Sequence, residues 1–540
     1  MEKTMKFLSM AALALMGAVM TGCSSDSDEL FSEPQQPENK DKVETLTTTV
    51  SFGDGVAATR ALTEDGVKTF AVGDQIAVVY ENTSGTTVKA VSTALTADDI
   101  TNGGKSAKFT VTVSNADKTK DVKYIYPASI ADDYGFLDYK PLDVQDGSLT
   151  TLASSLDACQ GIGAWNGENL PALALENQFT ICKFKIKAGG SDITSSITQL
   201  TINDGYNTYT VTPTSSLNDI WVAIRSDEIG KCTYKIYAAK GKDLYTKTVS
   251  GKAFDMGKIY PINVTTTKVD GAVSGQFTVN NSGKKVFFSQ GNLQAVCTSA
   301  DNDENTQETW TWQFAANQWD YIGGGTETQT GNNFINGNGS VSTAGTVDLF
   351  GWSTSKTYYG IHNTNDVNTY VDGIKPFNDW GNTMGSGWYT LDGGENSGEW
   401  HYLFMSRSAS TVNGTDNARF VKAYLFGTTH GIILFPDTYI HPAGVAAPTG
   451  INNTNDNSWN YNRYSAQDWA KMEAAGCVFL PAAGQRTGTT LESVNVIGHY
   501  WSSSRKTFSG SYMLFFYDTR FSSTTSSFAS GKAVRLVRDL

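Results

Sequence analysis

The fold of the C-terminal half is decided by a stretch that reads GCVFLPAAGQRTG at residues 476–488 and IGHYWSSS at residues 497–504. Its apolar run VFL ends at a proline, as expected of a buried strand that runs into a turn. Farther on, SYMLFFYDTRF at 511–521 is aromatic and extended, and VRLV at 534–537 alternates in the manner of a closing strand. The stretch therefore predicts a domain of short strands and tight turns.

One helix is expected in this domain, over residues 465–475. Ser465 can cap its N-terminus, with Asp468 three residues later, and Trp469 and Met472 share one face. Gly476 is placed to end the helix. We expect this helix to pack against the strand that begins at residue 478.

Five blocks of this half resemble, in order and spacing, a family of bacterial surface domains related to the C-type lectin and formylglycine-generating-enzyme fold. They are VFFSQGNL at 286–293, FAANQWD at 314–320, LPAAG at 480–484, YWSS at 500–503 and VRLV at 534–537. The resemblance covers about residues 272–540 and implies a loop-rich α+β head domain. Its motifs are fairly specific for the fold but say little about a ligand.

Length and composition limit what the whole chain can be. At roughly 150 residues per domain, 540 residues predict three or four units. The net charge is −13, only 18% of residues are charged, and 52 are glycine. This composition excludes a basic nucleic-acid-binding surface and favours a turn-rich, mainly β extracellular protein, so no nucleic-acid partner is expected.

The six cysteines form no C-x-x-C pair, which argues against a zinc ribbon or a redox motif. Cys182 and Cys232 lie on the same faces of their predicted strands as neighbouring apolar residues, a pattern typical of buried thiols. One disulfide among Cys159, Cys182 and Cys232 remains the alternative, because connectivity cannot be deduced from sequence.

The N-terminus has the features of an export signal. Lys3 and Lys6 precede an apolar run at 7–20 that is too short to span a bilayer. The run ends in MTGC, which looks like a bacterial lipoprotein signal with Cys23 as the lipid-carrying residue, and acyl chains would then anchor the protein in the outer membrane. An ordinary secretory cleavage site beside an incidental cysteine is the alternative.

Residues 24–44 are acidic, contain proline and have few large apolar side chains, so they are expected to form a flexible tether. The first acids, Asp26, Asp28 and Glu29, resemble a signal that sends lipoproteins to the outer face of the outer membrane. The same acids could instead serve only to make the tether soluble.

The middle of the chain alternates with period two. Leu46, Val50 and Phe52 fall on one face of a predicted strand, and FAVGDQIAVVY at 70–80 reads as a strand, a turn and a strand. Four blocks resemble the fimbrillin family, the subunits of type V pili: ATRA at 58–61, the block at 70–80, LENQFTICKFKI at 175–186 and MGKIYPINV at 256–264. The resemblance covers about residues 44–267 and implies two transthyretin-like β-sandwiches in tandem.

Fimbrillins are made as lipidated precursors. In the family a trypsin-like protease cuts after an arginine, the first strand leaves, and a strand from a neighbouring subunit fills the groove. On this chain the resemblance implies cleavage between Arg60 and Ala61 and departure of the strand at 46–52. Other fimbrillin subunits would then be partners by donor-strand exchange. The alternative is that Arg60 is a solvated loop residue and the chain stays uncut.

The predicted fold class is therefore mainly β, with two tandem transthyretin-like sandwiches followed by a loop-rich C-type-lectin-like α+β domain. The predicted divisions are a lipoprotein signal peptide at 1–22, a flexible acidic tether at 23–43, sandwiches at 44–190 and 191–267, a linker at 268–274 and the head at 275–540. Because the second sandwich leads into the head, it has no free terminal strand to donate. This favours a tip or accessory subunit over a stalk subunit.

All five histidines and ten of the twelve tryptophans lie beyond residue 271, so a binding or chemical site is expected in the head. Trp380, Trp388, Trp400 and Tyr402 lie in a segment rich in glycine, asparagine and serine. Exposed aromatic faces in such a context suit glycan or protein ligands. The alternative for any one of these tryptophans is a place in the core of the domain.

No catalytic or metal site is predicted. His430, Asp437 and His441 could supply metal ligands, but an intervening apolar strand gives no reason to place them together. Asp301, Asp303 and Glu304 are better explained as a solvated acidic loop than as a calcium site.

The catalytic cysteine pair of the formylglycine-generating relatives, a Gly-x-Ser-x-Gly elbow and the signatures of calcium-dependent sugar-binding lectins are all missing. The sequence thus predicts a binding protein without a cofactor, not an enzyme. It would be a surface adhesin that acts as a tip or accessory subunit of a type V pilus. The alternative is a non-polymerising outer-membrane lipoprotein for glycan capture.

Overall fold

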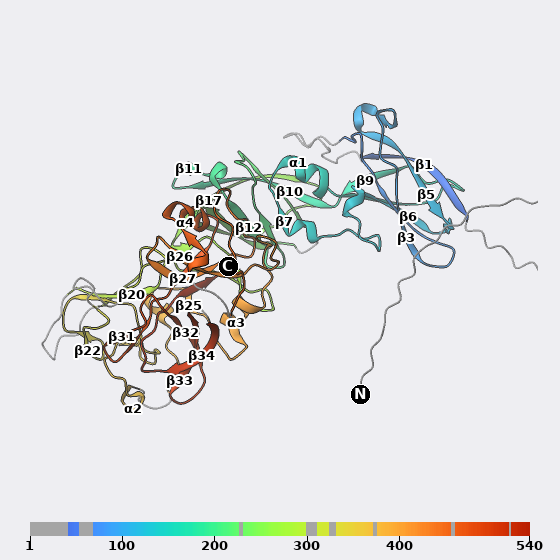
Figure 1. Cartoon of the computed structure of the whole chain (residues 1–540). Coiled ribbons are helices and arrows are strands. Elements are labelled where there is room, and N and C mark those ends of the chain that lie inside the picture. Colours follow the sequence, from blue (N-terminus) through green and yellow to red (C-terminus); the bar gives the residue numbers. More distant parts are fainter. Residues whose placement is uncertain are drawn as a thin grey trace, which may run out of the picture.

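A computed structural model describes residues 42–52, 69–225, 230–298, 310–322, 331–370, 375–454, 459–517 and 520–540. Strands dominate, which confirms the prediction of a mainly β chain. Figure 1 shows three bodies in a row: a first sandwich in blue, a second in teal and green, and a head that runs from yellow to red. No helix of these described residues is long and apolar enough to cross a membrane.

The first sandwich is one curled sheet of eight strands in the order β3-β2-β6-β8-β9-β1-β5-β4. Its strands are β1 Val43–Phe52, β2 Ala77–Glu81, β3 Thr87–Val91, β4 Ile100–Thr101, β5 Ser106–Ser114, β6 Asp121–Tyr126, β8 Cys159–Ala164 and β9 Leu173–Asn177. An aromatic cluster anchors its core, in which Phe70 stacks on Phe52 at 4.2 Å and meets Phe109 and Tyr126 edge-on.

The second sandwich has nine strands along the order β11-β10-β17-β16-β15-β12-β13-β7, with β14 beside β10. They are β7 Val144–Gln145, β10 Phe179–Ala188, β11 Ser191–Asp192, β12 Gln199–Asn203, β13 Thr208–Val211, β14 Ile220–Arg225, β15 Cys232–Lys240, β16 Asp243–Lys252 and β17 Ile259–Val273. Cys182, Phe184 and Ile186 point into its core, as their alternation predicted.

The division between the sandwiches differs from the predicted one at residue 190. The first sheet ends with β9 at Asn177, and β10 lies inside the second sheet, between β14 and β17. Moreover, residues 139–157 leave the first sandwich to pack on the second, with α1 (Leu149–Thr151) and the buried side chains of Leu152 and Leu156. Strand pairing decides this boundary, and the alternation of a strand does not reveal which sheet it joins.

The predicted linker at 268–274 is instead the end of β17. Lys268 is paired with Tyr245 of β16, its ammonium lies 2.9 Å from Asp243, and Val273 is buried. The strand therefore runs without a break from the second sandwich into the head.

The second sandwich and the head are also joined by side-chain contacts. Gln276 donates to Thr201 at 2.6 Å, Gln199 donates to Thr438 at 2.6 Å, and Tyr237 packs on Phe287. At Gly275 a Cβ would stand 1.9 Å from the carbonyl oxygen of Gly476, so only glycine allows this close approach. The C-terminus lies at the same junction (Figure 1).

The head is built from several small sheets around three cores. Its strands are β18 Phe277–Thr278, β19 Lys285–Phe288, β20 Leu293–Cys297, β21 Trp310–Phe314, β22 Ile335–Gly337, β23 Ser340–Val341, β24 Gly345–Val347, β25 Trp388–Thr390, β26 Phe420–Leu425, β27 Thr429–Leu434, β28 Arg463–Tyr464, β29 Val478–Pro481, β30 Gln485–Thr487, β31 Thr490–Glu492, β32 Gly498–Arg505, β33 Gly510–Tyr517, β34 Arg520–Ser527 and β35 Leu536–Asp539. The last strand, β35, pairs with both β19 and β25, so it ties the end of the head to its beginning.

Three helices accompany these strands: α2 Val367–Tyr370, α3 Gly398–Met405 and α4 Ala466–Ala474. The helix predicted over 465–475 is confirmed as α4. Ser465 and Asp468 form the expected capping box, and Trp469 and Met472 are buried in a core with Phe479 of β29.

Candidate functional site: strand grooves in the two sandwiches

The strand that the fimbrillin resemblance implies would leave, β1, is an interior strand of the first sheet, with β9 on one side and β5 on the other. Every residue from Val43 to Ser51 is paired antiparallel with β5, and residues Val50 to Phe52 are paired parallel with β9. Val50 is fully buried, and the Thr48 hydroxyl donates to the carbonyl of Pro171 at 2.6 Å. If β1 left, it would expose an apolar slot between β5 and β9 with a strand edge on each side.

An ion cluster holds the start of β1. The Lys118 ammonium lies 3.0 Å from Glu44 of β1 and 2.6 Å from Glu168, and Lys42 lies within 3.5 Å of both carboxylates. The hydrogen bond from Lys118 lowers the pKa of the Glu44 carboxyl, so the pair stays ionised at neutral pH. Because Glu168 and Lys42 are exposed, the cluster orients the strand but adds little to stability.

The second sandwich contains an open groove that the sequence did not predict. Strands β16 and β17 pair only through Asp243, Tyr245 and Thr246 of β16, and beyond that point they separate toward the loop at 253–258. Along the separated part, residues 259–266 of β17 pair with β10, and residues 247–252 of β16 pair with β15. In this described part of the chain, each strand thus keeps one edge without a ladder partner.

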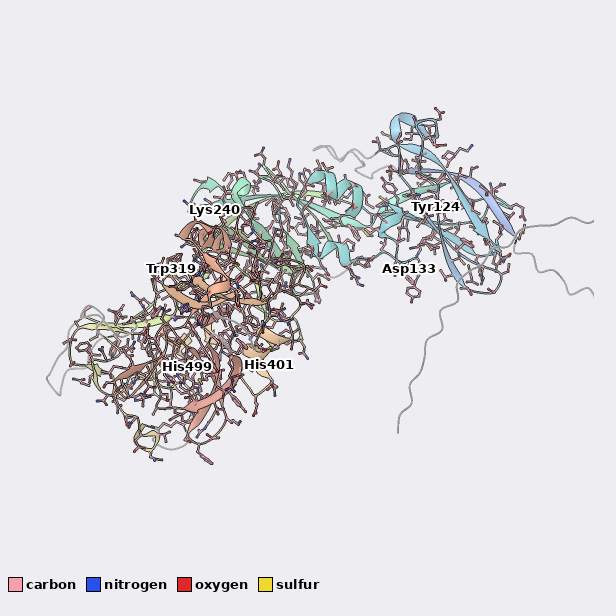
Figure 2. All side chains as sticks on the ribbon, viewed as in Figure 1. Tyr124, Asp133, Lys240, Trp319, His401 and His499 are labelled. Carbon is pink, nitrogen blue, oxygen red and sulfur yellow. The ribbon has the colours of Figure 1, made fainter. Side chains whose placement is uncertain are left out.

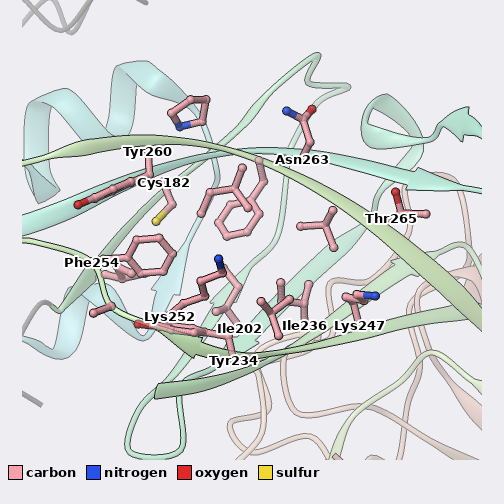
Figure 3. Close-up of a pocket in the computed structure, with 17 residues that line it drawn as sticks. Cys182, Ile202, Tyr234, Ile236, Lys247, Lys252, Phe254, Tyr260, Asn263 and Thr265 are labelled. Atoms are coloured by element: carbon pink, nitrogen blue, oxygen red, sulfur yellow. The ribbon is translucent and has the colours of Figure 1, made fainter. Parts of the chain in front are cut away.

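Apolar side chains form the floor of the groove, which has a volume of about 480 Å³ (Figure 3). Phe184, Ile236 and Val264 lie at the bottom and are almost fully buried. Lys247 and Lys252 lie along one lip, and Asn263 and Thr265 along the other. An apolar floor between two open strand edges is suited to an added β-strand, whose backbone would complete both ladders.

Some predicted site residues fall outside the described part of the chain. These are the lipidation residue Cys23, the processing pair Arg60 and Ala61, and the acidic residues Asp301, Asp303 and Glu304. The described chain resumes at Thr69, whose side chain packs against Gly104. Lipidation and cleavage therefore remain predictions.

The tryptophans predicted to bind a ligand in the head are buried and not exposed. Trp380, Trp388 and Trp400 are 0%, 8% and 1% exposed, so the expectation that they offer exposed faces is wrong. Trp380 packs on Phe377, and Trp388 on Phe314 of β21. Tyr402 is half-buried on α3.

The head's exposed aromatics lie elsewhere. Tyr461 is 62% exposed and Phe508 is 74% exposed. Near Tyr461, His430 stacks on Trp459 at 5.3 Å and also meets Tyr424. No local sequence pattern indicates this surface, because its residues come from three separate segments.

The histidines and acids considered for a metal site are held apart by their own partners. Asp437 pairs with Arg407 at 2.9 Å, His441 lies 3.0 Å from the Tyr439 hydroxyl, and His430 contacts the Asn495 carbonyl. No group of three His, Cys, Asp or Glu side chains suited to a metal occurs among the described residues. Figure 2 shows His401 and His499 at separate places in the head.

Burial governs the remaining titratable groups. It raises the pKa of the Cys182 and Cys477 thiols and lowers that of the His499 imidazole to about 3. Cys159, Cys182, Cys232, Cys297 and Cys477 are all buried, as expected for the thiols of the second sandwich. No disulfide forms among these five described cysteines.

Comparison with protein-family models gives no match, and no curated protein matches the chain. Among solved structures, the chain is similar to a fimbrial assembly protein from Parabacteroides distasonis at 12% identity, with a TM-score of 0.25 over 46% of this chain and 96% of that one. It is also similar to a "putative cell adhesion protein" from Bacteroides fragilis at 10% identity, with a TM-score of 0.24 over 51% and 95% of the two chains.

A second "putative cell adhesion protein", from Bacteroides uniformis, gives 15% identity and a TM-score of 0.21 over 43% of this chain and 98% of that one. These three structures are a fimbrial assembly protein and two proteins described as putative cell adhesion proteins. The function proposed for this chain rests on its own strands and grooves.

Proposed function

We propose that this protein is a cell-surface adhesin that joins a fimbrial filament by strand exchange and carries its head as the ligand-binding end. The observation that carries the proposal is the position of β1, which is paired on both edges, apolar on its inner face and attached to the N-terminal side of Arg60. A cut after Arg60 would separate β1 from the rest of the chain and allow it to be exchanged. The partners would be other fimbrillin-type subunits.

The direct connection of β17 to the head supports a tip or accessory role within the filament. A stalk subunit needs a terminal strand to donate, but β17 passes directly into the head through Val273 and the buried Gln276. The protein would therefore accept a strand without passing one on, as a tip or accessory subunit. It would reach the outer membrane through a lipid on Cys23 and remain at the cell surface.

The head is proposed to bind a protein or glycan and not to catalyse a reaction. With the tryptophans in the core, the exposed Tyr461 and the half-buried Tyr424 and His430 beside it become the first aromatic surface to test. Replacing Tyr461 by alanine should weaken attachment of the protein to cells or immobilised glycans without changing its unfolding.

A second candidate function is a lipoprotein that stays uncut and captures glycans at the surface. The complete pairing of β1 favours it, because the first sandwich is closed while β1 is in place. The two candidates differ in whether β1 can be replaced.

A strand-replacement assay tests the proposal. A chain that begins at Ala61 would be mixed with a peptide of the β1 sequence at 43–52. As a control, a matched peptide would carry aspartate in place of Val50 and Phe52. We expect the β1 peptide to bind and to restore cooperative unfolding of the first sandwich, and the control peptide to do neither. If the shortened chain unfolded cooperatively alone and bound neither peptide, exchange at this slot would be excluded.

A further inference from the structure

The head contains a buried lysine that the proposed function does not use. Lys532 is 0% exposed, although a lysine is rarely buried without an acidic partner. Its ammonium nitrogen, Nζ, donates to Oε1 of Gln485 at 2.8 Å and lies 5.5 Å from the centre of the Trp501 ring. No carboxylate of the described residues lies within ion-pairing distance of Nζ, and Glu492 attracts it only from farther away.

The backbone fixes the lysine and the glutamine beside each other. Arg486 and Gly531, the neighbours of Gln485 and Lys532, exchange two backbone hydrogen bonds of 2.9 and 2.8 Å. At Gly531 a Cβ would stand 2.2 Å from Cγ of Arg486, so the approach requires glycine. Lys532 also exchanges two backbone hydrogen bonds with Phe350, both 2.9 Å long. The contact between the two side chains is therefore built into the sheet.

The amide nitrogen of Gln485 has a partner of its own. Nε2 donates to Oε2 of Glu492 at 3.0 Å, and Glu492 is exposed at the end of β31. An amine, a carboxamide and a carboxylate are thus joined by two successive hydrogen bonds. These are the three groups that are needed to exchange the nitrogen of an amide and to carry a proton to the nitrogen that leaves.

We propose that Lys532 and Gln485 become joined by an amide bond between their side chains, with release of ammonia. The lone pair of Nζ attacks Cδ of Gln485, the bond from Cδ to Nε2 breaks, and one proton from the amine ends on the departing nitrogen. The Glu492 carboxylate, which accepts the hydrogen bond of Nε2, takes up the amine proton once Nζ has bonded to Cδ and returns it to Nε2 as that nitrogen leaves. The products are one secondary amide and one ammonia molecule, so the step needs no oxidant or other reactant.

Two properties of the site favour this reaction. Burial lowers the pKa of Lys532 to about 7, so a large fraction of the amine is neutral and nucleophilic at neutral pH. A buried cation without an acidic partner is also costly, and the neutral amide removes that cost. The bond would close a ring between residues 47 positions apart, in a head whose described cysteines form no disulfide.

Peptide mapping of the purified full-length protein tests the proposal. After denaturation and trypsin digestion, we expect one branched peptide that contains both Gln485 and Lys532, with a mass lower by one ammonia than the sum of its two parts. Trypsin should fail to cut after Lys532. Recovery of Gln485 and Lys532 in separate linear peptides from folded protein would overturn the proposal.

Matched variants test the parts. Lys532→Met removes the amine and should abolish the branched peptide. If that variant fails to fold, Glu492→Gln is the informative change, because Glu492 is exposed and its loss leaves the core intact. We expect Glu492→Gln to lower the branched fraction at least tenfold with unchanged near-ultraviolet circular dichroism. Glu395→Gln, at an exposed carboxylate paired with Lys506, should leave the fraction unchanged. Full branching in Glu492→Gln would overturn the role given to Glu492.

Discussion

The two sandwiches handle corresponding strands in different ways. In the first, β1 is parallel to β9, antiparallel to β5 and paired along almost its whole length. In the second, β17 is parallel to β10 and antiparallel to β16, but it leaves β16 beyond Thr246. One sandwich is therefore closed by its N-terminal strand, and the other is left with an apolar groove. By this comparison, the first sandwich would take up another strand only after β1 leaves, whereas the second already has two open edges.

The largest loss of stability should come from a charge placed on the buried face of β1. Val50→Asp would bury a carboxylate without a partner and should destabilise the first sandwich by about 4 kcal/mol or more. The matched change Val249→Asp, on half-buried Val249 at the groove of the second sandwich, should cost less than about 1 kcal/mol. Urea unfolding of both variants measures the difference. Equal losses in the free energy of unfolding would mean that Val249 on β16 is packed as tightly as Val50 on β1.

Between pH 6.5 and pH 5, acid should act mainly on the head, because neither sandwich contains a histidine. Burial lowers the pKa of His362 to about 2 and that of His499 to about 3, below the value of about 6.5 in an unfolded chain. Both imidazoles are neutral in the folded head. As the pH falls from about 6.5 toward 3, they bind protons only in the unfolded chain, so the folded state loses stability. Each of these histidines should lower the free energy of unfolding by about 2 kcal/mol between pH 6.5 and pH 5.

Tryptophan fluorescence can follow this loss, because ten of the twelve tryptophans lie in the head. The variant His499→Gln should show a shallower acid dependence than the unchanged protein. An identical pH profile for the two would show that His499 is already protonated in the folded head.

A smaller effect is expected at the junction of the second sandwich with the head. Gln276→Leu removes the hydrogen bond to the buried Thr201 hydroxyl and should cost about 1–2 kcal/mol. We expect the second sandwich and the head to unfold in one calorimetric transition, and this variant to begin to separate it into two. Gln313→Leu, at an exposed position of β21, should leave the transition unchanged. Two transitions in the unchanged protein would contradict the rigid junction.

The smallest effect should come from the ion cluster at the start of β1. Glu44→Gln removes one of the two carboxylates that pair with Lys118. It should cost at most about 0.5 kcal/mol of stability, and less in high salt. The lowered pKa of Glu44 means that this contribution is present near neutral pH and is lost in acid. A loss several times larger would mean that charge, and not the ladder and the core, holds β1 in its sheet.

Local patterns in the sequence predicted local structure well. The alternation of Leu46, Val50 and Phe52 identified β1, and Ser465 with Asp468 identified the start of α4. Both features depend on residues close together in the chain, where period and capping chemistry suffice.

Features that depend on distant partners could not be predicted. β10 joins the second sheet, and β17 continues where a linker was expected, because pairing with β16 and β10 decides both. The groove between β16 and β17 exists only because two strands part. Trp380 and Trp400 are buried by segments far along the chain, so their own neighbours did not reveal which way the rings face.

Strand exchange in the first sandwich requires that β1 be cut from the chain and replaced by a partner strand. The most direct test is to determine the N-terminus and intact mass of the protein from sheared surface filaments and from washed membranes. We predict a filament form that begins at Ala61 and a membrane precursor that begins at acylated Cys23. If every form were membrane-bound and began at Cys23, strand exchange would be contradicted, and the uncut glycan-capture lipoprotein would take its place.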